Sequence, residues 1–149
     1  MSVCIFFGHR ENYGLDEKIL CHAIEELIEK GVDTFYVGHQ GDFDRLVLRC
    51  LLQLKKNHQK PSFSVVLAYL PTKKSENDSY DVYSIYPEKV EMGHPKFAIE
   101  RRNQWMIDRA HYCLCYVNHT WGGAYKFVCR AKRRGLAVIN LGVVPLREI

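Results

Sequence analysis

The sequence predicts an α/β protein: a single doubly wound, Rossmann-like domain of about five mainly parallel strands flanked by helices. Short apolar runs of strand length alternate with longer segments whose apolar residues repeat at helical spacing. Each short run is almost continuously apolar, which is typical of parallel strands covered on both faces. The chain has 149 residues, 47% of them hydrophobic and 26% charged, so one domain over residues 1–149 is expected.

The first strand and helix are marked by a change of period. Residues 3–7 are continuously apolar and end at Gly8, which indicates a buried strand. Apolar residues then recur at helical spacing over residues 15–28, and Gly31 ends that pattern. Together they predict the first strand–helix unit.

The same alternation continues through the next segment. Residues 34–37 predict a second strand that ends at Gly38, and residues 43–54 carry one apolar face of a helix. Residues 63–70 predict a third strand, closed by Pro71.

Residues 72–95 interrupt the alternation. Lysines, serines and acids are interleaved there with Tyr80, Tyr83 and Tyr86. The spacing of three allows a short helix, and a flap or insertion is equally compatible. Long interruptions in small domains are more often functional than idle, with disorder as the alternative.

The alternation resumes in the last third of the chain. Residues 97–110 predict a helix, and residues 112–117 predict a fourth strand. Apolar residues over 124–131 mark another helix, and residues 136–141 supply a fifth strand.

Parallel sheets bind ligands beyond the carboxyl ends of their strands, which selects four loops: residues 8–10, residues 38–42, the tyrosine-rich segment and residues 118–123. The first holds Gly8, His9 and Arg10, where Arg10 would hold a phosphate and His9 would line the pocket; a solvated turn is the alternative. No GxGxxG fingerprint occurs there, so dinucleotide binding of the dehydrogenase kind is not expected.

The second loop combines glycines with polar side chains before a helix. Its residues are Gly38, His39, Gln40, Gly41 and Asp42. Glycines allow close backbone approach, and the helix start offers free N–H donors. The acid could accept hydrogen bonds from ribose hydroxyls, or Asp42 or Asp44 could cap the helix.

The helix over residues 97–110 and the last of these loops form the strongest signal. Arg102 and Asn103 lie on or beside the apolar face of the helix over 97–110, where a bound anion would give them a partner; a surface pair is the alternative. Trp121, Gly122 and Gly123 then stand between a predicted strand and a helix, where glycines and the helix dipole suit a phosphate.

These motifs together resemble the SLOG superfamily, which unites the Smf/DprA proteins, the LONELY GUY phosphoribohydrolases and small YpsA-like stand-alone domains. The resemblance covers nearly the whole chain. It rests on Phe7-Gly8-His9-Arg10, on Gly38-His39-Gln40-Gly41, and on Arg102-Asn103-Gln104-Trp105-Met106 followed by Gly122-Gly123, closest to the YpsA-like branch. It implies a Rossmann-like sensor or enzyme for nucleotide-derived ligands, ADP-ribose-like molecules among them.

One departure from the resemblance bears on catalysis. LONELY GUY enzymes carry PGGxGTxxE, whose final glutamate serves catalysis, and here Cys129 stands at that position. Without this carboxylate, N-glycosidic hydrolysis lacks its obvious acid–base group, although Glu100 or Asp42 could substitute. We therefore expect a binding protein more than an enzyme.

The expected function is capture of a phosphorylated nucleoside derivative, as a sensor or a sequestering protein, with Tyr83 or Tyr86 closing over the base. One alternative is a nucleotide N-glycosidase of the phosphoribohydrolase or deoxyribosyltransferase type. The other is single-stranded nucleic-acid binding, which the basic residues after position 125 suggest but which a net charge of +4 does not favour.

Composition adds several expectations about context. His9, His39 and His119 fall at the ligand edge without short metal-ligand spacing, so neither a metal nor a cofactor is expected. The six cysteines fall in strand-like and helical patterns and contain no CxxC, which indicates buried free thiols in a cytoplasmic protein. No membrane partner is expected, and SLOG relatives suggest a homo-oligomer.

Overall fold

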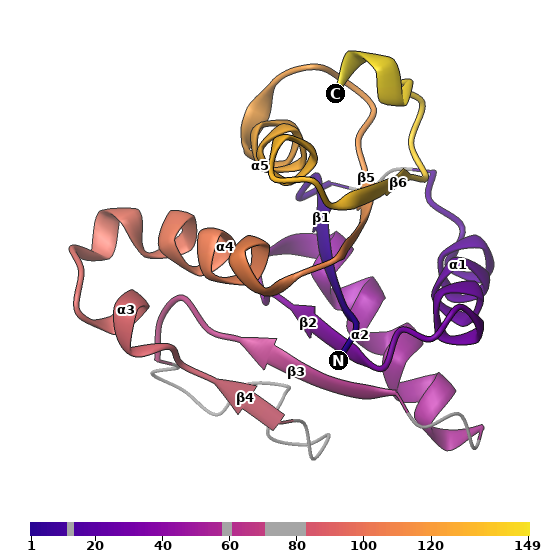
Figure 1. The fold of residues 1–149 in the computed structure, drawn as a ribbon, viewed down its shortest axis with the longest axis horizontal. Helices are drawn as coiled ribbons and strands as arrows, with labels where there is room; N and C mark the ends of the chain where they lie inside the picture. Colours follow the sequence, from indigo (N-terminus) through magenta and orange to yellow (C-terminus); the bar gives the residue numbers. More distant parts are fainter. Residues whose placement is uncertain (12–13, 58–60, 71–82) are drawn as a thin grey trace.

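The computed structural model describes residues 1–11, 14–57, 61–70 and 83–149, and it is an α/β structure (Figure 1). Its strands are β1 (Val3–Gly8), β2 (Thr34–Val37), β3 (Ser62–Val66), β4 (Tyr83–Ile85), β5 (Tyr112–Tyr116) and β6 (Ala137–Asn140). Its helices are α1 (Glu17–Glu29), α2 (Gly41–Lys56), α3 (Glu88–Glu91), α4 (Ala98–Arg109) and α5 (Gly122–Arg133), with short 3-10 turns η2 (Pro95–Phe97) and η3 (Leu146–Glu148).

All six strands pair in parallel, in the order β4-β3-β2-β1-β5-β6. The predicted fold class is therefore confirmed. The chain builds β1 to β4 outward in one direction and then returns to place β5 on the other side of β1. This reversal puts the topological switch point between β1 and β5, where open α/β sheets bind ligands.

Helices cover both faces of the sheet (Figure 1). One apolar core joins α1 and α2 to residues such as Phe6 and Phe35, and the other joins α4 and α5 to residues such as Ile5 and Cys113. Successive β1 residues belong to opposite cores because side chains alternate along a strand. Continuous apolarity in β1 thus reflects burial on both sides.

Part of the segment 72–95 forms regular secondary structure. Its described part, residues 83–95, contains β4, which pairs with β3, and the helix α3. Within the described residues the sheet accordingly has six strands, where the sequence predicts about five. Tyr80 and the rest of residues 71–82 lie outside the described residues.

The local signals at helix ends have clear structural causes. Asp16 caps α1 by accepting a hydrogen bond from the backbone N–H of Lys18 at 2.8 Å. Gly31 follows α1 with φ +101°, a conformation that glycine adopts at little cost.

The six cysteines carry no disulfide, and four of them (Cys4, Cys50, Cys113 and Cys115) are buried. Burial raises the pKa of the Cys4 and Cys50 thiols well above the ordinary value, so both stay protonated. Within the described part of the chain, no helix has both the length and the apolarity to span a bilayer.

Candidate functional site

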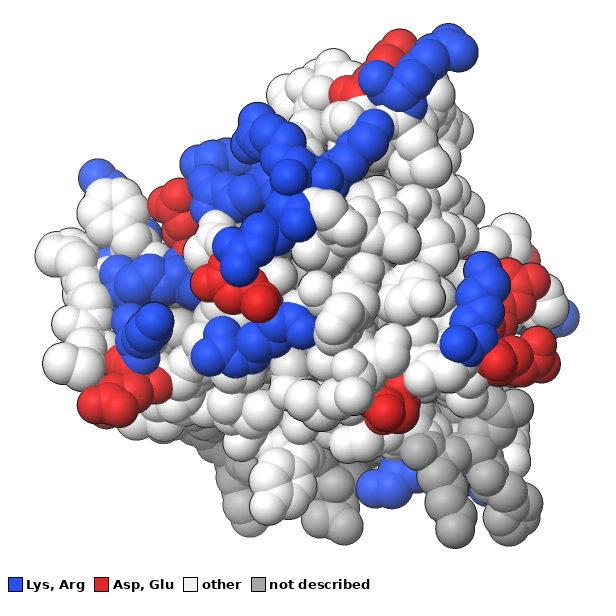
Figure 2. All heavy atoms as spheres, in the orientation of Figure 1, with Lys and Arg blue, Asp and Glu red and all other residues white. Residues whose placement is uncertain are grey.

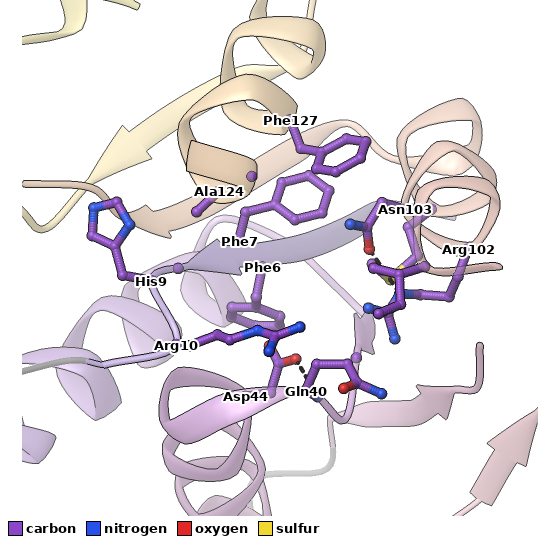
Figure 3. A pocket seen from close by; sticks show the side chains of 15 residues that line it. Phe6, Phe7, His9, Arg10, Gln40, Asp44, Arg102, Asn103, Ala124 and Phe127 are labelled. Atoms are coloured by element: carbon purple, nitrogen blue, oxygen red, sulfur yellow. Dashed lines mark hydrogen bonds between the residues drawn. The ribbon is translucent and has the colours of Figure 1, made fainter. Parts of the chain in front are cut away.

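A cavity of about 260 Å³ opens at the carboxyl ends of β1 and β2, between the starts of α2 and α5 and one face of α4 (Figure 3). The loop after β1 and the start of α5, the helix that follows β5, both line it, so it lies beside the switch point of the sheet. Fifteen residues line it: Phe6, Phe7, Gly8, His9, Arg10, Gly38, Gln40, Asp44, Ile99, Arg102, Asn103, Met106, Gly123, Ala124 and Phe127.

Arg102 is the main buried cation of this cavity. Its side chain is only 3% exposed, and Asn103 beside it is 6% exposed. The Arg102 Nε donates to Asn103 Oδ1 at 2.7 Å, and Nη1 donates to the carbonyl of Val66 at 3.2 Å. Among the described residues, Arg102 forms no ion pair with a carboxylate. A buried guanidinium is thus fixed in place by neutral acceptors and retains donors for an anion.

Asp44 brings a carboxyl group into the same cavity. Its Oδ2 accepts a hydrogen bond from the backbone N–H of Gln40 at 2.9 Å, across the first turn of α2 (Figure 3). Burial raises the pKa of Asp44 to about 6, although Arg102 and the Gln40 N–H act in the opposite direction. The carboxyl group therefore titrates close to neutral pH.

Gly38 allows Asp44 and Arg102 to approach each other. A Cβ atom at position 38 would lie 2.9 Å from Arg102 Nη1 and 2.9 Å from Asp44 Oδ2. Any larger residue would have to displace one of these groups. The glycine that ends β2 is thus a requirement of the site's geometry.

A second arginine and a helix start face the other side of the cavity. Arg10 is exposed, follows β1 and extends toward Asp44 and Gln40 (Figure 3). Its backbone carbonyl accepts from the N–H of Asp42 at 2.9 Å, which ties this loop to α2. The first turn of α5 contributes Gly123 and Ala124, and the side chain of the N-cap residue, Trp121, makes no capping hydrogen bond. Free N–H groups and the helix dipole make this helix start suited to an anion.

An apolar wall completes the cavity. Phe7 of β1 and Phe127 of α5 stack with ring centroids 5.7 Å apart, and Ile99 and Met106 of α4 add to the wall. Polar groups therefore occupy one side of the cavity and apolar side chains the other, as in small-molecule sites generally.

The structure brings together eight of the fifteen residues that the sequence singled out. These are Gly8, His9, Arg10, Gly38, Gln40, Arg102, Asn103 and Gly123. They come from loops after β1 and β2 and from α4 and α5, so segments far apart in the sequence meet at one site.

Three residues of the α2 loop do not line the cavity. Gly41 has φ +90° and lies under Arg10, and Asp42 is exposed and pairs with Arg45 at the surface. His39 lies beside Arg102; burial and then the Arg102 charge lower the pKa of this imidazole.

Tyr83 and Tyr86 do not line the cavity. Tyr83 is on the edge strand β4 and is 77% exposed, while Tyr86 packs against Val90 and Ala98. Nothing in the described residues brings either ring over the cavity. Their predicted role as a cover for a base is therefore without structural support.

Trp121 and Gly122 precede Gly123 in the chain but do not line the cavity. Gly122 begins α5 with φ +90°, and Trp121 before it is 68% exposed. His9 and His119 stack face to face, and His9 Nε2 accepts from the N–H of Asn118 at 3.0 Å. Among the described residues, no group of three or more His, Cys, Asp or Glu side chains could hold a metal ion.

Asp44 is the functional residue that sequence reasoning placed differently, as a candidate helix cap. The other lining residues that it did not select are Phe6, Phe7, Ile99, Met106, Ala124 and Phe127. Phe6 and Phe7 adjoin Gly8 in the sequence, and Ala124 and Phe127 follow Gly123 on the same helix. Their closeness in sequence to the predicted motifs is the signal by which these lining residues could be found. Cys129, at the position of the missing glutamate, does not line the cavity.

Comparison with known proteins adds no assignment: no family model and no curated protein matches this chain. The resemblance to the SLOG superfamily thus stays a prediction from the motifs.

Proposed function

We propose that the cavity binds the phosphorylated sugar of a nucleoside-derived ligand, such as a nucleotide or an ADP-ribose-like molecule. The observation that carries this proposal is Arg102, a guanidinium 3% exposed that lines a cavity. Asp44 acts on it through its charge, but the described residues contain no direct ion pair between Arg102 and a carboxylate. Burying an unpaired cation is costly, and an anionic ligand would offset that cost.

The remaining groups suit the rest of a phosphosugar. Arg10 and the free N–H groups at the start of α5 would bind phosphate oxygens. Asp44 and the amide of Asn103 would bind sugar hydroxyls, since a carboxylate accepts and an amide both donates and accepts. Phe7 and Phe127 would cover the apolar edge of the sugar.

The volume of the cavity is enough to enclose part of such a ligand. At about 260 Å³ it is smaller than the roughly 300–1,000 Å³ typical of sites that enclose a whole small molecule. A phosphoribosyl group would fill it, and a base would lie outside.

The biological role that fits this cavity is sensing or sequestering such a ligand. The motif resemblance to SLOG proteins supports the same ligand class, and it also supports a homo-oligomer in the cytoplasm. The replacement of the family's catalytic glutamate by Cys129 favours binding over turnover.

Isothermal titration calorimetry against ADP-ribose, cyclic ADP-ribose, NAD and nucleoside monophosphates tests the proposal. We expect at least one to bind, and expect Arg10→Ala to weaken it by roughly ten- to hundredfold, the usual effect of losing a charge-assisted hydrogen bond. Arg133→Ala, which removes a charge from the exposed far end of α5, should not change the affinity. Absence of binding to every compound would contradict the proposal.

A second candidate function is hydrolysis of the ligand's N-glycosidic bond, and Asp44 favours it. Its pKa of about 6 suits a group that exchanges protons near neutral pH. Water would add to the anomeric carbon as the C–N bond breaks, and the base would leave with a proton. This reaction predicts free base by chromatography after incubation with nucleotide, and none with Asp44→Asn. Full recovery of intact nucleotide would exclude it for that compound.

A further inference from the structure

Three aromatic rings stack in series beside the cavity. The rings of His9 and His119 lie with centroids 3.8 Å apart and planes inclined by 17°, and those of His119 and Trp121 lie 3.9 Å apart and inclined by 19°. We call these three rings the ring stack. Its spacing and tilt are those of closely stacked planar rings.

Backbone hydrogen bonds hold the ring stack in this orientation. His9 Nε2 accepts from the N–H of Asn118 at 3.0 Å, so that nitrogen carries no proton. His119 Nδ1 lies 3.0 Å from the carbonyl of Trp121, which can only accept, so Nδ1 donates. Burial and then the neighbouring His119 lower the pKa of His9, in agreement with a neutral ring. The rings are therefore fixed before any ligand arrives.

The ring stack runs from the cavity to the solvent. His9 at its inner end lines the cavity, and Trp121 at its outer end is 68% exposed. His9 and Arg10 also line a shallow groove of about 470 Å³ together with Glu11, Asn118 and His119. The cavity and the groove thus share two residues. An indole this exposed adds little to the apolar cores, which leaves its outer face available.

We propose that the exposed end of the ring stack, Trp121, is the stacking surface for the base of the nucleotide whose phosphosugar occupies the cavity. This inference rests on the proposed function. Trp121 immediately precedes Gly122 and Gly123, so the stacking surface and the phosphate-binding helix start share one turn. Every nucleobase has a flat π face, so such a site discriminates nucleotides from sugar phosphates rather than one base from another.

The test compares adenosine monophosphate with ribose 5-phosphate, which differ by the base. We expect wild-type protein to bind the nucleotide more tightly, by the roughly five- to hundredfold that stacking on one aromatic side chain contributes. Trp121→Ala should remove this advantage and leave ribose 5-phosphate affinity within about twofold of wild type. Trp121→Phe should restore most of it. Phe97→Ala, which removes another exposed ring distant from the stack, should have no effect.

A fluorescence measurement separates stacking from a change of fold. The chain contains two tryptophans, so Trp105→Phe leaves Trp121 as the one indole. Adenosine monophosphate should quench its emission, and ribose 5-phosphate should not. If both ligands bind and Trp121→Ala changes neither affinity or weakens both equally, the stacking proposal is contradicted while the proposed function stands. If neither ligand binds wild-type protein, the stacking proposal is contradicted, and the proposed function is contradicted too when ADP-ribose, cyclic ADP-ribose and NAD also fail to bind.

Discussion

Arg102 and Asp44 show how two side chains of opposite charge can share a site without neutralising each other. Both approach the Cα of Gly38, yet the described residues contain no ion pair between them. Arg102 stays a cation because guanidinium pKa values are far above neutral, even though burial lowers its pKa. Asp44 is the group that changes charge, because burial raises its pKa to about 6. The net charge of the cavity lining therefore becomes more positive on mild acidification.

The raised pKa of Asp44 predicts a pH-dependent stability. Between about pH 4 and pH 6 the folded protein holds a proton on Asp44 that the unfolded chain releases, so stability falls as the pH rises through this window. Relative to Asp44→Asn, wild-type protein should lose on the order of 1–3 kcal/mol between pH 4 and pH 7, measured by urea unfolding.

Asp42→Asn removes a carboxylate from the exposed side of the same helical turn and serves as the control. If the difference between wild type and Asp44→Asn does not change with pH, Asp44 has an ordinary pKa and the description of its surroundings is wrong.

At the residue scale, the sequence predicts several of the polar groups that line the site. It does not predict which atoms each of these groups contacts. Arg102 and Asn103 are recognised because polar residues on an apolar helix face need partners. Asp44 is not, because its position in the cavity depends on the close approach of Gly38 and on the first turn of α2. The contact between His9 and Trp121 through His119 joins residues from two loops and has no signature in the sequence.

At the scale of elements, the start of α5 combines two glycines that have different roles. Gly122 has φ +90°, whereas Gly123 does not occupy the left-handed region, and a Cβ at position 123 would meet nothing within 4 Å. Gly122 is thus needed for the turn into the helix. Gly123 leaves its side of the helix start open toward the cavity.

The same substitution at these neighbouring positions should have opposite consequences. Gly123→Ala should keep or slightly raise the free energy of unfolding, since alanine is the better helix former, and should weaken nucleotide binding about tenfold or more by obstructing the N–H groups. Gly122→Ala should lower the free energy of unfolding by about 1–2 kcal/mol because of its positive φ. Thermal unfolding and calorimetry on both variants measure these effects. Unchanged affinity in a folded Gly123→Ala protein would argue against a ligand at this helix start.

The sequence predicts the helices and strands whose apolar residues form a clear pattern. It does not predict the short strand β4. The other five strands carry the apolar runs that predict them, although β6 forms the opposite edge of the sheet and none of its residues is fully buried. β4 has three residues, Tyr83–Ile85, of which the first two are exposed, and it pairs with β3 alone. An edge strand of this length carries no periodicity by which it could be distinguished from a loop.

At the scale of the whole molecule, the site joins helices that cover the two faces of the sheet. β1, β2 and α2 form one side of the cavity, and α4 and α5 form the other. A ligand that contacts both sides would resist their separation, so binding should raise the unfolding temperature in a concentration-dependent manner.

The basic surface over α4 and α5 is partly neutralised by the protein's own acids (Figure 2). Glu100 lies 3.7 Å from Lys126 and 3.3 Å from Arg130, and Asp108 lies 3.0 Å from Arg134. Such a mixed surface gives little of the phosphate neutralisation that nucleic acids require. We therefore expect single-stranded oligothymidine to bind weakly or not at all near 0.15 M salt in a fluorescence anisotropy titration. Micromolar affinity there, with a steep loss on added salt, would favour nucleic-acid binding instead.

The overall topology follows from the alternation of period, because continuous apolar strands separated by amphipathic helices leave the parallel, doubly wound sheet as the simplest arrangement. The location of the site follows from the topology. The depth of the cavity and its division into a polar and an apolar side cannot be predicted from the topology. They depend on how Phe127 and Asp44 pack across the sheet edge.

The central claim is that a phosphosugar binds between Arg102, Arg10 and the start of α5. A crystal structure of the protein soaked with ADP-ribose tests it most directly. The account predicts a phosphate group within hydrogen-bonding distance of the Gly123 N–H and of an arginine of the cavity, with a ribose beside Asp44. A ligand bound elsewhere on the molecule, with the cavity holding only solvent, would contradict it.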